Sequence, residues 1–399
     1  MRLKVNLTKG GVLKLAKFNI KITYPKEKMK YNKIRLEAAF NFKPVDRAPV
    51  LFGTFERYYL KARGVTYEEF YSNSDAMLHH MILNQAWAIE NIPDDRCVDN
   101  ILTIPGPWFD NTLESSAFGA EVFFYKNDPP RVKHLNLTID EAMKIEIPHP
   151  LSGLYKTKKK YFLDWREKLK NYNVTFNDEP GKIEIGIQET GGGSPILQAI
   201  ELFGTDFYEW LYKYPEVCHS ILKKITTFLI NKGLYWRKID PRVPSIYLLA
   251  DDFAETISLK MYREFLVPYN NMIFDVMGEG IRDGRSLHNC GNSTHLLDAF
   301  VDDLKITSFW LYGYQVDPFL VAEKMAKRKI FSWGNLNCLT LLNGPLEKIY
   351  EESINCIKAF APYGGFYLGD GANVAPGTPL EHLQQVMKAS IDFGEIPKR

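Results

Sequence analysis

The fold is decided by a stretch that begins Ser245-Ile-Tyr-Leu-Leu-Ala250 and continues to Phe393 as an alternation of short apolar segments and longer amphipathic ones. The short segments are rich in β-branched and aromatic residues, which is typical of strands, and the longer segments have helical spacing. Strand–helix alternation predicts parallel pairing, because each helix returns the chain to the edge where the next strand starts. This half of the chain therefore predicts an α/β fold, a (β/α)8 TIM barrel.

Candidate strands along the whole chain are about eight in number, which a closed barrel needs. They lie near residues 50–53, 98–104, 183–187, 245–250, 285–290, 306–310, 329–333 and 366–368. Helices are expected at residues 259–277, 294–301, 318–326, 345–360 and 379–393, with Ser258, Ser293 and Asp317 at positions that favour N-caps. We predict an N-terminal extension over residues 1–32 and a single barrel domain over 33–399, with an insertion at about 120–177 beside the barrel mouth.

The composition excludes several classes of protein. Of 399 residues, 45% are hydrophobic, and 50 basic and 48 acidic residues leave a net charge of +2, so no nucleic-acid partner is expected. Five widely spaced cysteines do not form the framework of a secreted protein, and the apolar run at residues 10–17 is too short for a signal peptide or membrane span. We expect a cytoplasmic protein without a membrane partner, and a homo-oligomer is left open.

A pair of metal-ligand side chains ends the fifth candidate strand, in Arg285-Ser-Leu-His288-Asn-Cys290-Gly291-Asn292. Residues two apart on a strand leave from the same face, so His288 and Cys290 can reach one point. Imidazole and thiolate suit zinc, and Gly291 allows a sharp exit at the rim where barrel active sites lie. The alternative is that both residues are ordinary packing residues.

A catalytic zinc usually takes three protein ligands, so a third donor must come from elsewhere. Cys338 follows the seventh strand, Asp370 follows the eighth, and Glu121 lies in the insertion, from which it could fold over the mouth. Asp251 and Asp252 follow the fourth strand and could act as metal ligand, proton carrier or substrate clamp. The residues alone leave the third ligand open.

Aromatic residues follow several of the same strands. Trp310 and Tyr312 follow the sixth, and Phe52 and Phe55 follow the first. Most such residues pack in cores, but at a barrel mouth a subset could wall a substrate pocket. The glycine run Gly191-Gly192-Gly193 lacks the rest of a phosphate-loop motif, so a flexible mouth loop is expected there.

Several motifs together resemble the uroporphyrinogen decarboxylase superfamily from about residue 33 to the end. They are Asp46-Arg-Ala-Pro-Val50, Phe118-Gly-Ala-Glu121, Ala250-Asp-Asp-Phe, Ser258-Leu-Lys-Met-Tyr-Arg-Glu-Phe-Leu-Val-Pro-Tyr269, Leu287-His-Asn-Cys-Gly291, Gly334-Asn-Leu-Asn337 and Gly377-Thr-Pro-Leu-Glu-His-Leu383. The His-x-Cys-Gly motif is similar to that of the corrinoid-dependent methyltransferase branch. The resemblance implies a (β/α)8 barrel in which zinc activates or positions a methyl donor or acceptor beside a cobalamin carried by a separate protein.

At two positions this chain differs from the family motifs, and each difference bears on which reaction and substrate are expected. The decarboxylase has a paired-arginine stretch for porphyrinogen carboxylates where this chain has Phe52-Gly-Thr-Phe-Glu-Arg-Tyr58, so decarboxylation is disfavoured. Thiol-methylating members have a third zinc-ligating cysteine where this chain has Ala372. Glu121, Asp251, Asp370 or Cys338 would then complete the site, or zinc is weakly held. A zinc with less sulfur is a harder Lewis acid, suited to an ether or phenolate oxygen.

The sequence therefore predicts a zinc-dependent methyltransferase of the O-demethylase type. It would move a methyl group from a methoxylated, aromatic compound to the cob(I)alamin of a corrinoid protein, with acidic residues (Asp251, Asp252 or Glu121) assisting. Trp310, Tyr312, Phe52 and Phe55 are the candidates for the ring pocket. The alternatives are a methylamine, thioether or coenzyme thiol as substrate, a decarboxylase, or a non-catalytic barrel that binds a corrinoid protein.

Overall fold

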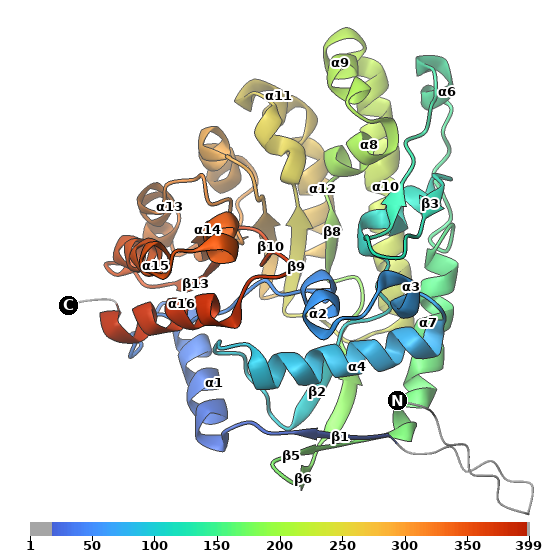
Figure 1. The fold of residues 1–399 in the computed structure, drawn as a ribbon. Coiled ribbons are helices and arrows are strands. Elements are labelled where there is room, and N and C mark those ends of the chain that lie inside the picture. The colour runs from blue at the N-terminus through green and yellow to red at the C-terminus, as the bar shows by residue number, and fades with distance from the viewer. Residues whose placement is uncertain (1–17, 397–399) are drawn as a thin grey trace, which may run out of the picture.

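A six-stranded parallel sheet is at the centre of the computed structural model, which describes residues 18–396. The strand order is β13–β12–β11–β10–β9–β8, so neighbours in the sheet are also neighbours along the chain (Figure 1). The strands are β8 (Gly191–Gly193), β9 (Ile246–Ala250), β10 (Asp283–His288), β11 (Ser308–Trp310), β12 (Phe331–Leu336) and β13 (Phe366–Asp370). The predicted α/β class with parallel pairing is confirmed.

Further parallel pairs lie beyond this sheet. Val50 forms an isolated parallel bridge with Leu368 of β13, and β2 (Ile101–Ile104) pairs in parallel with β7 (Lys182–Ile185). Within residues 18–396 no ladder joins Val50 to β2 or β7 to β8. The arrangement has the strand succession of a TIM barrel, whereas full closure into eight strands stays a prediction.

The glycine run expected as a flexible loop is instead the strand β8, so that prediction was wrong. Gly191, Gly192 and Gly193 pair with Leu248, Leu249 and Ala250 of β9. A Cβ at Gly191 would lie 2.1 Å from the Leu248 carbonyl oxygen, which means that the strands approach too closely for a side chain. Glycine is depleted in strands on average, and here close packing outweighs that preference.

Helices separate the strands of the sheet. After β8 come α8 (Pro195–Phe203), α9 (Asp206–Lys213) and α10 (Pro215–Ile239), and after β9 come α11 (Leu259–Phe265) and α12 (Val267–Met277). After β11 comes α13 (Pro318–Lys324), after β12 come α14 (Cys338–Asn343) and α15 (Leu346–Phe360), and after β13 comes α16 (Leu380–Phe393). The segment after β10 holds a short 3-10 turn (Thr294–Leu296) and a π-helix (Ala299–Asp303).

No helix in the described part of the chain is long and apolar enough to cross a membrane.

The predicted helix ends were partly right. Ser258 caps α11 and Asp317 caps α13 through their side chains. Ser293 makes no cap, and its hydroxyl is buried without a hydrogen-bond partner among the described residues, so that prediction was wrong. The helix expected over residues 259–277 is split at Leu266, because Pro268 starts a new helix rather than continuing the old one.

The N-terminal part packs against the sheet, and its first strand and first helix lie below the sheet, on the side of the amino ends of the strands (Figure 1). It contains β1 (Phe18–Ile22), α1 (Lys26–Phe40), α2 (Glu56–Arg63), α3 (Tyr67–Phe70), α4 (Ser74–Asn91) and α5 (Leu113–Ala117). Helix α1 contacts β13, where the Tyr367 hydroxyl donates to the Leu36 carbonyl at 2.7 Å. β1 pairs with β5 (Tyr172–Phe176), which pairs with β6 (Glu179–Pro180). The predicted domain boundaries are not decided by these contacts.

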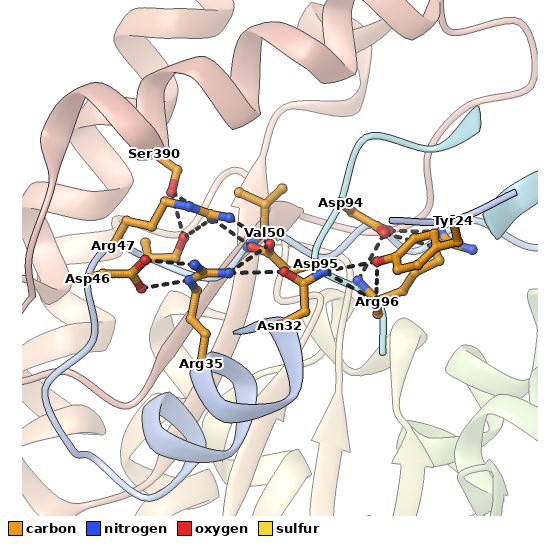
Figure 2. Close-up of polar contacts among 11 residues, drawn as sticks. Tyr24, Asn32, Arg35, Asp46, Arg47, Val50, Asp94, Asp95, Arg96 and Ser390 are labelled. Atoms are coloured by element: carbon orange, nitrogen blue, oxygen red, sulfur yellow. Dashed lines mark hydrogen bonds and ion pairs between the residues drawn. The ribbon is translucent and has the colours of Figure 1, made fainter. Parts of the chain in front are cut away.

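A buried ionic network connects α1 to the segment at residues 46–50 (Figure 2). The Asp95 carboxylate is fully buried, accepts both guanidinium nitrogens of Arg47 at 2.7 Å and accepts the Val50 amide at 2.8 Å. Arg35 of α1 reaches Asp95 at 3.2 Å and also pairs with Asp46. The Asp-Arg-Ala-Pro-Val motif therefore anchors α1 to the segment that leads into the bridge between Val50 and Leu368.

The predicted insertion contains the hairpin β3 (Val122–Phe123) and β4 (Arg131–Val132), α6 (Ile139–Met143) and α7 (Tyr155–Lys168). Helix α7 is tied to the rest by buried charges. Lys158 pairs with Glu189, which also pairs with Lys232 of α10 at 2.7 Å, and Lys232 lies 3.1 Å from Glu114. Each cation faces a carboxylate, as the low-dielectric interior demands.

Candidate metal centre

Three metal-ligand side chains converge at the carboxyl ends of β9 and β10. Ala250 and His288 are paired across these strands, so Asp252 and Cys290, each two residues further on, lie at the same level. The ligand atoms of Asp252, His288 and Cys290 all lie within 4.8 Å of one another. Among residues 18–396 they form the one group of three or more His, Cys, Asp and Glu side chains with metal-binding geometry.

Hydrogen bonds orient the cluster. The Nε2 atom of His288 lies 3.1 Å from Oδ1 of Asp252, and the Cys290 amide donates to the same oxygen at 3.2 Å. The His288 Nδ1 atom lies 2.9 Å from the Trp310 carbonyl oxygen. A carbonyl can only accept, so Nδ1 carries a proton and Nε2 is the nitrogen left to bind a metal. This backbone contact is the outer hydrogen bond that metal-ligating histidines usually have.

The charges of His288 and Asp252 shift each other's pKa. Burial alone would lower the pKa of His288, but the facing Asp252 carboxylate raises it well above its ordinary value. Burial alone would raise the pKa of Asp252, but the imidazolium holds it below its ordinary value. Burial raises the pKa of the Cys290 thiol. Metal binding would replace the His288 proton and the thiol proton, as is usual for such sites.

The donor set fits zinc. It offers one carboxylate oxygen, one imidazole nitrogen and one thiolate sulfur, and a catalytic zinc takes three such ligands and keeps an open position. All three residues of the cluster are half-buried. Asp252 therefore fits the role of the third ligand, for which the residues alone left several candidates.

Asp251 points away from the cluster and is held in the core. Its Oδ2 atom accepts the Tyr262 hydroxyl at 2.8 Å and the Asn270 amide at 3.1 Å, and Oδ1 has no partner among the described residues. Burial raises the pKa of Asp251 to about 6. Its neighbour Asp252 is the first residue of the 3-10 turn after β9 and faces His288 instead.

Asp370 and Cys338 lie by the loops that follow β13 and β12. The Gly53 amide donates to Oδ1 of Asp370 at 2.7 Å, while the buried Oδ2 has no partner among the described residues. Burial raises the pKa of Asp370 to about 6, with His288 close enough to lower it somewhat. Burial raises the pKa of the Cys338 thiol to about 12, and the backbone amides of residues 371–373 face that thiol. Neither residue belongs to the metal cluster.

Glu121 lies at the start of the β3–β4 hairpin. Its side chain is 62% exposed and its carboxylate is 4.0 Å from Lys133. It is not part of the cluster, and the hairpin does not bring it to His288 or Cys290. A catalytic role for Glu121 stays a prediction without a contact to support it.

The aromatic candidates separate into three groups: one beside the metal cluster, two buried in the core and one exposed. Trp310 is paired with His288 across β10 and β11, and its ring packs edge-on against Trp333 at 5.2 Å. The buried Trp310 Nε1 atom has no partner among the described residues. Tyr312 and Phe52 are buried, and Tyr312 stacks on core Phe309. Phe55 is 46% exposed, so Trp310 is the candidate closest to the metal cluster along the strands.

Three features of the site had no sequence signal specific enough to assign them. Asp252 was one of two adjacent carboxylates, and only the direction of the chain after β9 decides which of them meets His288. The orienting group for His288 is a backbone carbonyl, which any residue at position 310 provides. Glu255, which accepts the Asn292 amide at 2.6 Å and supports the turn after Cys290, could have been found only from the structure.

Comparisons with known proteins agree with this fold. The family model of uroporphyrinogen decarboxylase (URO-D) matches residues 32–393. The uroporphyrinogen decarboxylase of Xanthomonas campestris pv. campestris is 23% identical over 380 residues, covering 89% of this chain and 97% of the relative. That of Coxiella burnetii is 23% identical over 190 residues, covering 46% of this chain and 49% of the relative. A solved methyltransferase from Methanosarcina mazei has a TM-score of 0.63 at 22% identity, covering 91% of this chain and 98% of that one, which shows a shared fold.

The fold and the strand-end cluster define an α/β protein of an enzyme family. The family match extends over most of the chain, from α1 to the end of α16. The chain belongs to the uroporphyrinogen decarboxylase (URO-D) family.

Proposed function

We propose that this protein is a zinc-dependent methyltransferase that moves a methyl group from a methoxylated aromatic compound to the cob(I)alamin of a partner corrinoid protein. The observation that carries the proposal is the convergence of Asp252, His288 and Cys290. A site for decarboxylation alone has no need of a nitrogen–sulfur–oxygen donor set. The methyltransferase fold of the Methanosarcina mazei protein supports the same choice.

The proposed methyl transfer breaks one bond and forms another. The bond between the methyl carbon and the ether oxygen breaks, a bond between that carbon and cobalt forms, and the oxygen keeps the electron pair and takes a proton. Zinc held by the three side chains would supply Lewis-acid polarisation of that oxygen. With one carboxylate and one thiolate among its ligands, it would be harder than a sulfur-rich zinc and suited to oxygen.

This chain's own residues would supply the rest of the chemistry. The His288 contact to the Trp310 carbonyl fixes the imidazole, so that the ligand geometry is set before substrate arrives. The Asp370 carboxyl, whose buried Oδ2 has no partner among the described residues and whose pKa burial raises to about 6, would give a proton to the departing oxygen. The Trp310 ring, next to His288, would form one wall for the substrate ring.

The test mixes the zinc-loaded protein with a cob(I)alamin carrier and a panel of methoxyarenes, and follows the cobalt absorption spectrum. Methyl-cobalt should form with at least one donor and should not form with the Cys290→Ser variant. Absence of methyl-cobalt with every methoxyarene would contradict the proposal, and formation with a methylamine or thioether instead would redirect it to that substrate.

Decarboxylation is the second candidate, because the curated relatives that cover this chain are uroporphyrinogen decarboxylases. Arg57, the one arginine in the stretch 52–58, forms a two-point pair with Asp110 at 2.5 and 2.8 Å rather than standing free for a substrate carboxylate. Incubation with uroporphyrinogen separates the candidates. Carboxyl loss from that substrate would favour the decarboxylase over the methyltransferase.

A further inference from the structure

A cavity lined by aromatic rings lies away from the metal cluster, between α3, the start of α4, the β3–β4 loop and α7. Its volume is about 450 Å³, within the range of small-molecule sites. We name it the aromatic cavity. Its lining residues are Glu68, Tyr71, Met77, Phe109, Phe124, Tyr125, Lys126, Leu154, Thr157 and Tyr161. None of these hydrogen-bonds or ion-pairs with Asp252, His288 or Cys290.

Ring faces and ring edges dominate this lining. Tyr71 stacks on Phe109 with the ring planes 28° apart, and Phe124 meets Tyr71 edge-on at 5.0 Å. Tyr161 of α7 packs against Phe109 with the ring centroids 6.1 Å apart. Phe124 and Tyr125 remain 45% and 43% exposed, which leaves apolar ring surface for a ligand to cover.

The charged groups of the cavity are already engaged with one another. Lys126 lies 4.0 Å from Glu68, and the Lys126 carbonyl accepts the Glu68 amide, so both charges stand at the rim as a pair. Behind the wall, Asp110 is paired with Arg57. The Tyr71 hydroxyl is buried and so is turned away from the open space, and burial raises its pKa, which keeps the ring neutral. Arg131 lies over the Tyr125 ring, with its guanidinium carbon 5.9 Å from the ring centroid. Because Glu68 is paired and a cation already lies at the rim, a cationic ligand would meet no free carboxylate there.

We propose that the aromatic cavity binds a small, flat, uncharged aromatic molecule at a site distinct from the metal cluster. Tyr71 and Phe109 already stack on each other, so a flat ring would lie against the exposed rings of Phe124 and Tyr125, in the offset and edge-on arrangements that aromatic pairs prefer. A saturated ring of the same size cannot do so. The proposal does not depend on the methyltransferase function and can hold if that function fails.

Direct binding to the full-length protein tests this, by calorimetric titration with phenol, with cyclohexanol as the non-flat ring of the same size, and with tetramethylammonium as a cation. Phenol should bind at least tenfold more tightly than either comparison ligand. Phe124→Ala should weaken phenol binding at least tenfold, and Thr157→Trp, which fills the cavity without removing a ring, should do the same. Tyr212→Ala, which truncates a ring that is 82% exposed elsewhere, should leave binding unchanged.

The His288→Ala and Cys290→Ser variants distinguish this cavity from the metal cluster. Both should keep the phenol binding that Phe124→Ala weakens, even if the wild type also binds phenol, the product of the proposed reaction, at the metal cluster. Loss of phenol binding in either variant would place the ligand at the metal cluster and overturn the proposal. Equal binding of cyclohexanol, tighter binding of tetramethylammonium, or no phenol binding at all would also overturn it. Thermal melting of each variant confirms that a lost ligand is not a lost fold.

Discussion

Nε2 of His288 lies 3.1 Å from Oδ1 of Asp252, with the two side chains extending from the ends of neighbouring parallel strands. The other nitrogen of the same ring is held by the Trp310 carbonyl. A proton on Nε2 thus occupies the place that a metal ion would take, between the carboxylate and the imidazole. The geometry explains why the ligand atoms of the cluster are aimed at one point.

The first prediction concerns metal content. Purified wild-type protein should hold about one zinc per chain, and Asp252→Ala, His288→Ala and Cys290→Ser should each lose most of it, because three protein ligands are the minimum for a catalytic zinc. Elemental analysis by mass spectrometry after dialysis measures this.

Cys338→Ser is the matched control, since Cys338 is a cysteine at a strand end outside the cluster. It should retain zinc, and so should Glu121→Ala. A Cys338→Ser variant without zinc, together with an Asp252→Ala variant that keeps it, would mean that the thiol is the third ligand.

The sequence was sufficient for the part of the site that depends on strand periodicity. His288 and Cys290 were predicted to share a face because residues two apart do so, and the structure brings them together. The choice between Asp251 and Asp252 depends on how the chain leaves β9 into a 3-10 turn, which periodicity does not specify. Long-range partners such as Tyr262, which holds Asp251, are set by packing between helix and strand.

The same distinction holds for the fold. The strand–helix alternation after Ser245 predicted β9 to β13, and residue preferences failed where tertiary contacts outweighed them, as at Gly191. The charged anchor around Asp95 was also beyond prediction, because its partners come from α1 and from the segment at residues 46–50. Local sequence patterns therefore predict individual helices and strands. Which of them pack together depends on long-range contacts such as the buried ion pairs of Asp95.

The second prediction concerns this anchor. Asp95→Asn keeps the side-chain volume but leaves Arg47 and Arg35 with a neutral partner, and their side chains are only 12% and 10% exposed. Breaking a buried pair in this way should cost about 3–5 kcal/mol in the free energy of unfolding. The midpoint of urea unfolding measures it, with an unchanged slope.

Asp46→Asn is the control, because it removes a carboxylate from the same arginine, Arg35, but its side chain is 63% exposed. The cost there should be below about 1 kcal/mol. Equal losses in the two variants would mean that burial does not set the strength of this network.

The third prediction is a pH dependence of stability. Burial alone would raise the pKa of Glu189, but Lys158 and Lys232 lower it to about 2, against an ordinary value of 4.5. Between these two pH values the unfolded chain binds a proton that the folded chain does not, so stability should fall as the pH falls through this range. Glu189→Gln should reduce that slope and lower stability at pH 7 by roughly 3 kcal/mol.

Glu167→Gln, a side chain 78% exposed, should follow the wild type; an identical slope in Glu189→Gln would show that the network does not control acid unfolding.

The last prediction concerns the glycines of β8, which differ from one another in the space around them. A Cβ at Gly191 would lie 2.1 Å from the backbone oxygen of Leu248, so Gly191→Ala must move one strand away from the other and should cost about 1–3 kcal/mol or more. At Gly192 the nearest atom to a Cβ is the Lys232 ammonium nitrogen at 3.5 Å, an ordinary contact distance, so Gly192→Ala should be tolerated within about 1 kcal/mol. Thermal melting and hydrogen exchange of the β9 amides compare the two variants.

Because the β8–β9 ladder leads directly to Asp252, Gly191→Ala should also weaken zinc binding, whereas Gly192→Ala should not. Equal effects of the two substitutions would show that residues 191–193 are not held as a strand in solution.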